Sequence, residues 1–399
     1  MKPLIPVFLI DLDSVLLEPL GYRKAVQSTL NWFTERMGLG DQYPGEEVIA
    51  SLEAVNMTSE WDMVPVLLAA IIDGLMKENP GMQLPEDLLQ ACDLVRSKSL
   101  QPPNVDFASL PIILGKHFKP GMEYSTLAFE LNQTGSAQPP YPNLIDLPIL
   151  KSLLLNTRAL DGALSTRVFQ HFTLGSERFA ELSGHTPLFA CDSYLEKFDR
   201  HLLNEQTRDL LLMAWRDSLV NLAVYTARPS KPEKDCPPGY NYSPEAEVAL
   251  ETLGLQELPL IATGQINWLS EHLGVPVHKL GKPSPVQALA AIAAAYTRQV
   301  EASLLAAADL QLKGKTEFFQ NLPGLAIHVF EDSGGNTASV RRAVDRLNEA
   351  GLICSFNAWG IGDNPDKQRA LLQAGAELVP DINQAVQRAF QMDGISVRL

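Results

Sequence analysis

Two aspartates, Asp11 and Asp13, directly follow the unbroken apolar run VFLI near the start of the chain. Like charges this close together repel each other, and they are costly to desolvate at the end of a buried strand. Carboxylates in such a position can bind a divalent cation, act as a nucleophile or exchange protons. The plain alternative is a solvated turn after a strand, and these two residues alone do not exclude it.

Polar residues that suit a phosphate site follow other apolar segments in the same way. Thr226 ends the run NLAVYT, and Lys282 lies in KLGKPSP, just before a helical pattern. Glu331 and Asp332 follow LAIHVF. Because the carboxyl ends of parallel strands lie at one edge of a sheet, residues from remote parts of the chain would meet there. Several such groups in one chain favour a ligand site over strand ends that are polar only because they face water.

The elements that would position these residues form an alternating pattern. Apolar runs bounded by turn residues predict strands at PLIPVFLI, NLAVYT, LPLIAT, LAIHVF and LICSFN. Helical patterns follow at 284–300 and 336–351, and the tail LLQAGAELVPDINQAVQRAF adds a short strand and a closing helix. This alternation predicts an α/β fold with a doubly wound parallel sheet.

Residues 18–195 differ from the rest of the chain. Amphipathic stretches such as YRKAVQSTLNWFTERMG and VPVLLAAIIDGLMKEN alternate with proline-rich loops, and strand signals are sparse. We therefore expect a catalytic core formed by residues 1–17 and 196–399. Residues 18–195 would form a large, mostly helical insertion after the first strand, and 191–203 would form the return hinge. Arg200 is expected in a surface or hinge salt bridge, with a substrate clamp as the alternative.

Composition limits the function classes. The chain has 399 residues, 46% of them hydrophobic and 20% charged, which predicts a globular protein of about two domains. Its net charge of −15 argues against nucleic acid as a partner, because phosphate backbones are bound by clustered Lys and Arg. The four cysteines are far apart, the apolar runs are too short to span a membrane, and the apolar N-terminus soon meets Asp11. We expect a cytoplasmic protein.

The order of the polar groups resembles the four motifs of the haloacid dehalogenase (HAD) superfamily. DLDSV resembles the first motif, VYTARP the second, GKPSP the third and VFEDSGGN the fourth. The resemblance covers residues 1–17 and roughly 196–399. It implies a Rossmann-like core, with a cap between the first and second motifs that closes over small substrates.

The resemblance also implies a role for each residue. Asp11 would attack phosphorus and form an aspartyl-phosphate, and Asp13 would protonate the leaving alcohol and then activate water. Thr226 would donate a hydrogen bond to a phosphoryl oxygen, and Lys282 would neutralise charge on the phosphate and on Asp11. Mg²⁺ would be held by Asp11, Asp332 and the backbone carbonyl of Asp13.

Asp13 indicates the reaction. A halide leaves without a proton, whereas an alkoxide needs one, so an acid at this position favours phosphatases over dehalogenases. The resemblance therefore implies an Mg²⁺-dependent phosphoric monoester hydrolase that acts on a small phosphorylated metabolite. The alternatives are a phosphomutase or phosphotransferase of the same fold, or a non-catalytic protein that binds a phosphate ligand.

Two residues depart from the family pattern. Ser14 stands where many members have Gly, and Asn336 takes a place often held by a second Asp. Asn336 can still reach a metal-bound water or Lys282, although the affinity for metal would fall. This departure supports the non-catalytic alternative.

Three further residues are candidates for substrate binding. Arg228 follows Thr226 closely, although a solvated loop arginine fits the sequence equally well. Trp61 and Asp62 lie in NMTSEWDM, which resembles an Asn/Asp-Trp segment of a phosphatase subgroup that includes histidinol-phosphatase-like sequences. The alternative is structural: Trp61 would pack in the cap core and Asp62 would cap the next helix. Asp363, in WGIGDNPD, comes one strand too late for the metal motif and is expected at a turn or rim.

Overall fold

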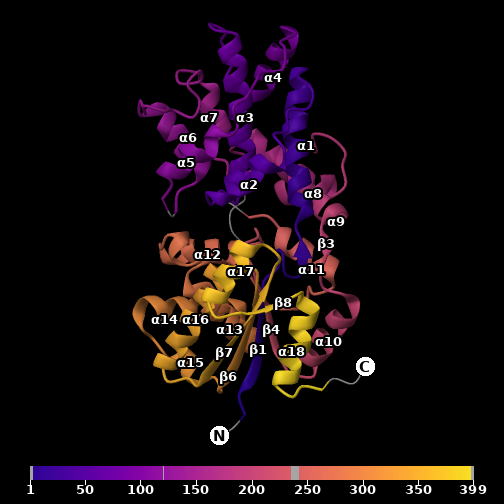
Figure 1. The fold of residues 1–399 in the computed structure, drawn as a ribbon, viewed down its shortest axis with the longest axis vertical. Helices are drawn as coiled ribbons and strands as arrows, with labels where there is room; N and C mark the ends of the chain where they lie inside the picture. The colour runs from indigo at the N-terminus through magenta and orange to yellow at the C-terminus, as the bar shows by residue number, and fades with distance from the viewer. Residues whose placement is uncertain (1–2, 120, 235–241, 397–399) are drawn as a thin grey trace. The chain divides into compact units, whose positions relative to one another are not determined.

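A computed structural model describes residues 3–119, 121–234 and 242–396 (Figure 1). The chain forms two compact units. Of the described residues, the first comprises 3–19, 199–234 and 242–396, and the second comprises 20–119 and 121–198. The sequence analysis places the two points at which the chain passes between the units after residue 17 and before residue 196.

The first unit is built on a parallel six-stranded sheet with the order β5-β4-β1-β6-β7-β8. Its strands are β1 (Ile5–Ile10), β4 (Asn221–Tyr225), β5 (Leu260–Ile261), β6 (Leu325–Glu331), β7 (Cys354–Ile361) and β8 (Glu377–Val379). Every neighbouring pair within the sheet runs parallel. The predicted α/β fold with a doubly wound parallel sheet is therefore confirmed.

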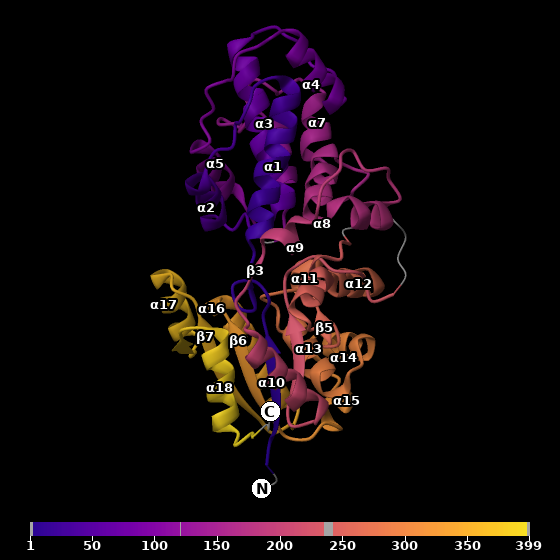
Figure 2. The same ribbon diagram turned by 90° about the vertical axis from the view of Figure 1, so that its right-hand side faces the viewer.

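Helices cover both faces of this sheet (Figure 2). They are α10 (Glu205–Arg216), α11 (Glu245–Leu253), α12 (Thr263–Leu273), α13 (Pro285–Thr297), α14 (Val300–Lys313), α15 (Glu317–Gln320), α16 (Gly334–Glu349), α17 (Pro365–Gln373) and α18 (Ile382–Met392), with the short 3-10 helix η1 (Val277–Lys279). Val7 and Leu9 of β1 pack in one apolar cluster with α13, α14 and α16. Phe8 and Ile10 pack in another with α10, α11 and α18. Because both faces are buried, the strands are nearly continuous apolar runs.

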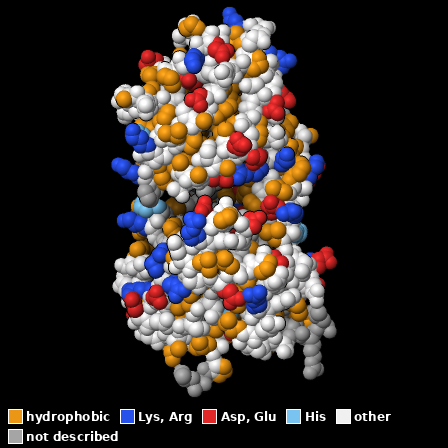
Figure 3. Space-filling view, viewed as in Figure 1, with side chains coloured by type: hydrophobic (Ala, Val, Ile, Leu, Met, Phe, Trp, Pro, Cys, Tyr) orange, Lys and Arg blue, Asp and Glu red, His pale blue; other side chains and the backbone are white. Residues whose placement is uncertain are grey.

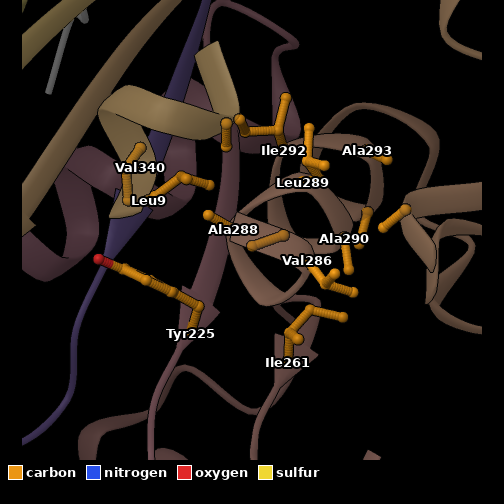
Figure 4. Close-up of a cluster of buried hydrophobic side chains, with 14 of the residues drawn as sticks. Leu9, Tyr225, Ile261, Val286, Ala288, Leu289, Ala290, Ile292, Ala293 and Val340 are labelled. Atoms are coloured by element: carbon orange, nitrogen blue, oxygen red, sulfur yellow. The ribbon is translucent and has the colours of Figure 1, made fainter. Parts of the chain in front are cut away.

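Helix α13 lies against β1 and β4 and contributes small side chains to that core (Figure 4). It starts where Pro285 follows the N-cap Ser284, whose side chain accepts a hydrogen bond from the Val286 N–H. The sequence predicts one helix over 284–300. Instead, α13 ends at Thr297, Arg298 adopts a left-handed conformation with φ 58°, and α14 begins at Val300.

Strand β1 lies at the topological switch point of the sheet. From β1 the chain continues through β4 and β5 on one side, and then through β6, β7 and β8 on the other. Ligands of open α/β sheets bind outside the carboxyl ends of the strands at such a point. Asp11, which immediately follows β1, is thus in the position where a ligand site is expected.

The second unit is mostly helical, as predicted. Its helices are α1 (Leu20–Met37), α2 (Glu46–Ala54), α3 (Glu60–Glu78), α4 (Leu88–Ser97), α5 (Ser109–His117), α6 (Tyr124–Gln133), α7 (Ile149–Leu154), α8 (Leu164–Ser183) and α9 (Tyr194–Phe198). Helix α3 is buried on nearly all sides because α1, α6, α7 and α8 pack around it. This explains its long apolar run, VPVLLAAII.

A short antiparallel ribbon marks the two crossings of the chain. Strands β2 (Leu17–Glu18) and β3 (Arg200–His201) pair where the chain leaves and re-enters the first unit. Glu18 and Arg200 form an ion pair across the ribbon, which is the salt bridge predicted for Arg200.

The surface charges, the helix lengths and the cysteines place few constraints on the functional site. The face in Figure 3 shows acidic and basic side chains interspersed. Among the described residues, no helix is long and apolar enough to cross a bilayer. Cys92, Cys191 and Cys354 are free thiols. Part of the proline-rich loop 227–245, including Cys236, lies outside the described residues.

The two glycines that open α16 provide a test of the packing near the carboxyl end of β6. A Cβ atom at Gly334 would lie 2.4 Å from the Ala370 carbonyl oxygen of α17, whereas at Gly335 its nearest neighbour would be 3.8 Å away. We expect Gly334→Ala to lower the free energy of unfolding by about 1–3 kcal/mol. Gly335→Ala should raise it by up to about 1 kcal/mol. Thermal unfolding of both variants checks this, and equal stability would contradict the packing argument.

Candidate active site

The centre of the site is an ammonium group held between two carboxylates. Lys282 Nζ lies 3.0 Å from Asp11 Oδ1 and 2.7 Å from Glu331 Oε1. The side chain of Lys282 is 6% exposed and that of Glu331 is fully buried. Asp11 and Glu331 come from neighbouring strand ends, and the Asp11 N–H donates to the Phe330 carbonyl at 3.0 Å. The sheet therefore fixes the spacing of the two acids between which Lys282 lies.

Tyr225, at the end of β4, supports the same lysine in two ways. Lys282 Nζ lies 3.7 Å from the centroid of the Tyr225 ring, close enough for a cation–π interaction. The Tyr225 hydroxyl donates to Glu331 Oε1 at 2.7 Å, and its ring belongs to the core cluster under α13 (Figure 4). Sequence analysis missed this residue. The available signal was its position directly before Thr226 in VYTARP.

The side-chain amide of Gln287 attaches the Lys282 loop to the sheet. Its Oε1 accepts a hydrogen bond from the Lys282 N–H at 2.9 Å. Its Nε2 donates to the carbonyls of Thr226 at 2.9 Å and Ile261 at 3.1 Å. These carbonyls lie at the ends of β4 and β5, so one side chain both satisfies buried backbone groups and sets the position of Lys282.

Glu331 is a site residue whose role the sequence did not assign. Its Oε2 accepts from the Ser333 N–H at 3.2 Å and from Asn336 Nδ2 at 3.4 Å. Asn336 was expected to reach a metal-bound water or Lys282; in the structure it donates to Glu331, and a contact with a metal-bound water stays a prediction. A neutral amide is favourable here, because a second aspartate would place another negative charge beside a fully buried one.

A third carboxylate completes an acidic cluster. Oxygen atoms of Asp11, Glu331 and Asp332 all lie within 4.8 Å of one another, a spacing that could hold a metal ion. The expected ligand set of Asp11, Asp332 and the backbone carbonyl of Asp13 stays a prediction, and Glu331 lies beside two of its members. Asp332 forms an ion pair with Lys367 in the first turn of α17. Carboxylate oxygens are the hard ligands that Mg²⁺ prefers.

Burial governs the proton affinities of this cluster. It raises the pKa of Asp11 well above its usual value, and the charge of Glu331 adds to the effect while Lys282 opposes it. Burial also raises the pKa of Asp332 against the charge of Lys367. Burial alone lowers the pKa of Lys282, but the carboxylates of Asp11 and Glu331 outweigh it, so the pKa is raised. Lys282 is therefore charged, and the cluster favours an additional proton or cation.

Asp13 belongs to a second ionic group at the edge of the cluster. Arg228 Nη2 lies 2.7 Å from Asp13 Oδ1 and 2.9 Å from Asp199 Oδ2, and Arg228 Nε donates to both oxygens of Asp13. The side chains of Arg228 and Asp199 are 1% and 3% exposed, while that of Asp13 is 31% exposed. The alternative of a solvated loop arginine is therefore wrong. A direct contact between Arg228 and substrate stays a prediction.

Thr226 and Ser14 shape the backbone around these groups. The Thr226 N–H donates to the Ile261 carbonyl at 3.0 Å, and its Oγ1 accepts from the Arg228 N–H at 3.1 Å. A hydroxyl that accepts one bond still has its own proton to donate. Ser14 has φ 63°, a backbone conformation that glycine adopts most readily. This explains why glycine suits the position of Ser14.

Trp61 and Asp62 are accounted for by packing within the second unit. Trp61 is 5% exposed and Asp62 is 3% exposed. Asp62 forms an ion pair with Arg158 and accepts from the Ser125 N–H at 3.0 Å, in the first turn of α6. Asp62 was expected to cap the next helix, but it lies inside α3 and instead accepts from the first turn of α6. A role of either residue in substrate binding stays a prediction.

The buried arginine gives a prediction about stability. Arg228→Met should lower the free energy of unfolding by about 3–5 kcal/mol, because it removes the counter-charge of the buried Asp199. The control is Arg216→Met, which removes the exposed 2.9 Å pair with Glu257 and should cost at most about 1 kcal/mol. Chemical denaturation distinguishes the two. If the losses are similar, the group around Arg228 is not a buried ionic one.

The acidic cluster gives a prediction about pH. Because the pKa of Asp11 is raised, the native state holds more protons than the unfolded chain above pH 3.8, and stability falls as pH increases through that window. Without divalent metal at pH 7, Asp11→Asn should raise the free energy of unfolding by about 0.5–2 kcal/mol. The gain should vanish near pH 4. Asp309, whose pKa its lysine partners lower, is the control: Asp309→Asn should not stabilise.

Comparison with known proteins supports the fold. No protein-family model matches the chain, and no curated protein matches it. A crystal structure described only as a target of the Northeast Structural Genomics Consortium superposes with a TM-score of 0.65 at 15% identity, covering 98% of this chain and 99% of that one. Phosphatase Tt82 from Thermococcus thioreducens gives a TM-score of 0.42 at 15% identity, over 96% and 98% of the two chains. The first likeness shows a shared fold, and the second is too low to carry an argument.

Proposed function

We propose that this protein is an Mg²⁺-dependent phosphatase of the HAD type, which hydrolyses a small phosphorylated metabolite through an aspartyl-phosphate on Asp11. One observation carries the proposal: a buried carboxylate at the carboxyl end of the central strand lies against a buried lysine and two further acids. This arrangement supplies a nucleophile, a fixed positive charge and oxygen ligands in one place.

The charge of the cluster supports a divalent ion. When ionised, the three carboxylates carry one more negative charge than their partners, Lys282 and Lys367, carry positive charge. A divalent cation would offset this excess, so that the ion and Lys282 together can attract a phosphate group. Asp11, Asp332 and the backbone carbonyl of Asp13 would hold Mg²⁺, with the Glu331 carboxylate beside it. The ion would neutralise phosphoryl oxygens and orient the phosphate towards Asp11.

The residues of the chain account for the chemical steps. An oxygen of Asp11 attacks phosphorus, and the bond from phosphorus to the alcohol oxygen breaks. Lys282 neutralises charge at Asp11 and on the phosphoryl group, and the Thr226 hydroxyl donates to a phosphoryl oxygen. Asp13 gives a proton to the departing alcohol. It then takes a proton from the water that attacks phosphorus, and the bond from phosphorus to the Asp11 oxygen breaks, which frees phosphate and the carboxylate. Arg228 orients the Asp13 carboxylate for both transfers.

The alternatives differ in the fate of the aspartyl-phosphate. A phosphomutase or phosphotransferase would pass the group to a second hydroxyl instead of water. A non-catalytic binding protein drew its support from Asn336, but the hydrogen bond from Asn336 to Glu331 gives that residue a role within a complete cluster. This contact favours a catalytic site over a non-catalytic one, and the phosphate-release experiment below separates hydrolysis from transfer.

Phosphate release from a panel of phosphomonoesters tests the proposal. We expect turnover with Mg²⁺ and none with EDTA. Asp11→Asn should lower kcat by about 10⁴-fold or more, as the loss of a nucleophile does, and Asp13→Asn by about 10²–10⁴-fold. Asp309→Asn, at an exposed ion pair, should leave kcat unchanged. Absence of release by folded protein that binds Mg²⁺ would contradict hydrolysis.

A further inference from the structure

The two lysines of the acidic cluster differ in how firmly they are held. Lys282 is 6% exposed and has Asp11, Glu331 and the Tyr225 ring around its ammonium group. Lys367 is 52% exposed and reaches Asp332 from the first turn of α17. The side chain of Asp332 is only 13% exposed, so the flexible, exposed Lys367 is the more mobile member of the pair and loses rotamer entropy when it is fixed there. Lys282 is thus held firmly in the site, whereas the ammonium group of Lys367 can move away from Asp332 more easily.

We propose that Lys367 is an exchangeable counter-ion for Asp332: it neutralises this carboxylate in the metal-free protein and releases it when a divalent cation binds. This inference rests on the metal centre of the proposed function. It assigns Lys367 a role in setting the affinity for metal, with no contact to the reacting atoms required.

Competition for the same carboxylate is the physical basis of the proposal. Lys367 Nζ donates to Asp332 Oδ2, and Asp332 is one of the three acids whose oxygens lie within 4.8 Å of one another. A Mg²⁺ ion requires short contacts to its oxygen ligands and repels a nearby ammonium group. Metal binding therefore includes the free energy of breaking the Lys367–Asp332 pair.

The structure offers space for the released side chain. A groove of about 770 Å³ within the first unit is lined by Lys367, Asp332, Asp363 and Asn364 among others. Asp363, four residues before Lys367, offers a second carboxylate in the lining of this groove. The ammonium group can thus leave Asp332 without displacing packed side chains.

Calorimetric titration of Mg²⁺ into the metal-free protein at low salt measures the competition. Lys367→Met should bind Mg²⁺ about fivefold more tightly than the wild type, and the difference should shrink as salt screens the pair. Lys367→Arg keeps the charge and should remain close to the wild type. Lys315→Met is the matched control, since Lys315 is 55% exposed and pairs with Asp309 at 3.0 Å, far from the acidic cluster in sequence. It should leave the affinity unchanged.

A double-mutant cycle separates the pair from a general effect of surface charge. In an Asp332→Asn background, Lys367→Met should change the Mg²⁺ affinity much less than in the wild type. Equal or weaker binding by Lys367→Met in the wild-type background would overturn the proposal, as would a wild type that binds no Mg²⁺. Phosphate release could still occur if Lys367→Met bound Mg²⁺ no more tightly than the wild type, so that result would leave the proposed function standing. Conversely, a Lys367 effect on binding in a protein that releases no phosphate would support the counter-ion and contradict the phosphatase.

Discussion

The contact on which the site depends is the ammonium group of Lys282 between Asp11 and Glu331. Two buried carboxylates on neighbouring strands repel each other, and without a cation between them at least one would take up a proton. Lys282 lies 3.0 Å from one and 2.7 Å from the other. Its loop comes from a third part of the chain and is attached to β4 and β5 by Gln287. The charge balance therefore requires that β1, β4, β5 and β6 all be in place.

The same constraint explains why the surrounding residues are not interchangeable. Tyr225 contributes a ring face to Lys282, a hydroxyl to Glu331 and apolar surface to the core under α13. Phenylalanine would preserve only two of these contributions. Glu331 receives four donors, so its charge is matched on both oxygens. Buried ionic groups of this kind are stable only when every member is satisfied.

The parallel sheet and the positions of Asp11, Thr226 and Lys282 could be predicted, because buried strands produce apolar runs and ligand residues follow their carboxyl ends. The role of Glu331 could not be, since its partners come from segments that only the folded sheet brings together. The division between α13 and α14 depends on one left-handed residue, Arg298, which has no reliable sequence signal. Burial of Arg228 depends on Asp199, which stands in none of the motifs.

The ionic group around Arg228 connects the chemistry to the path of the chain. Asp13 precedes the point where the chain leaves the first unit, and Asp199 is the residue at which it returns. One guanidinium group holds both carboxylates. In the proposed reaction, a substitution at Asp199 would therefore disturb the carboxylate of Asp13, although Asp199 lies outside every recognisable motif. A mutational scan of activity would then group Asp199 with the residues of the first motif, although it is remote from them in the sequence.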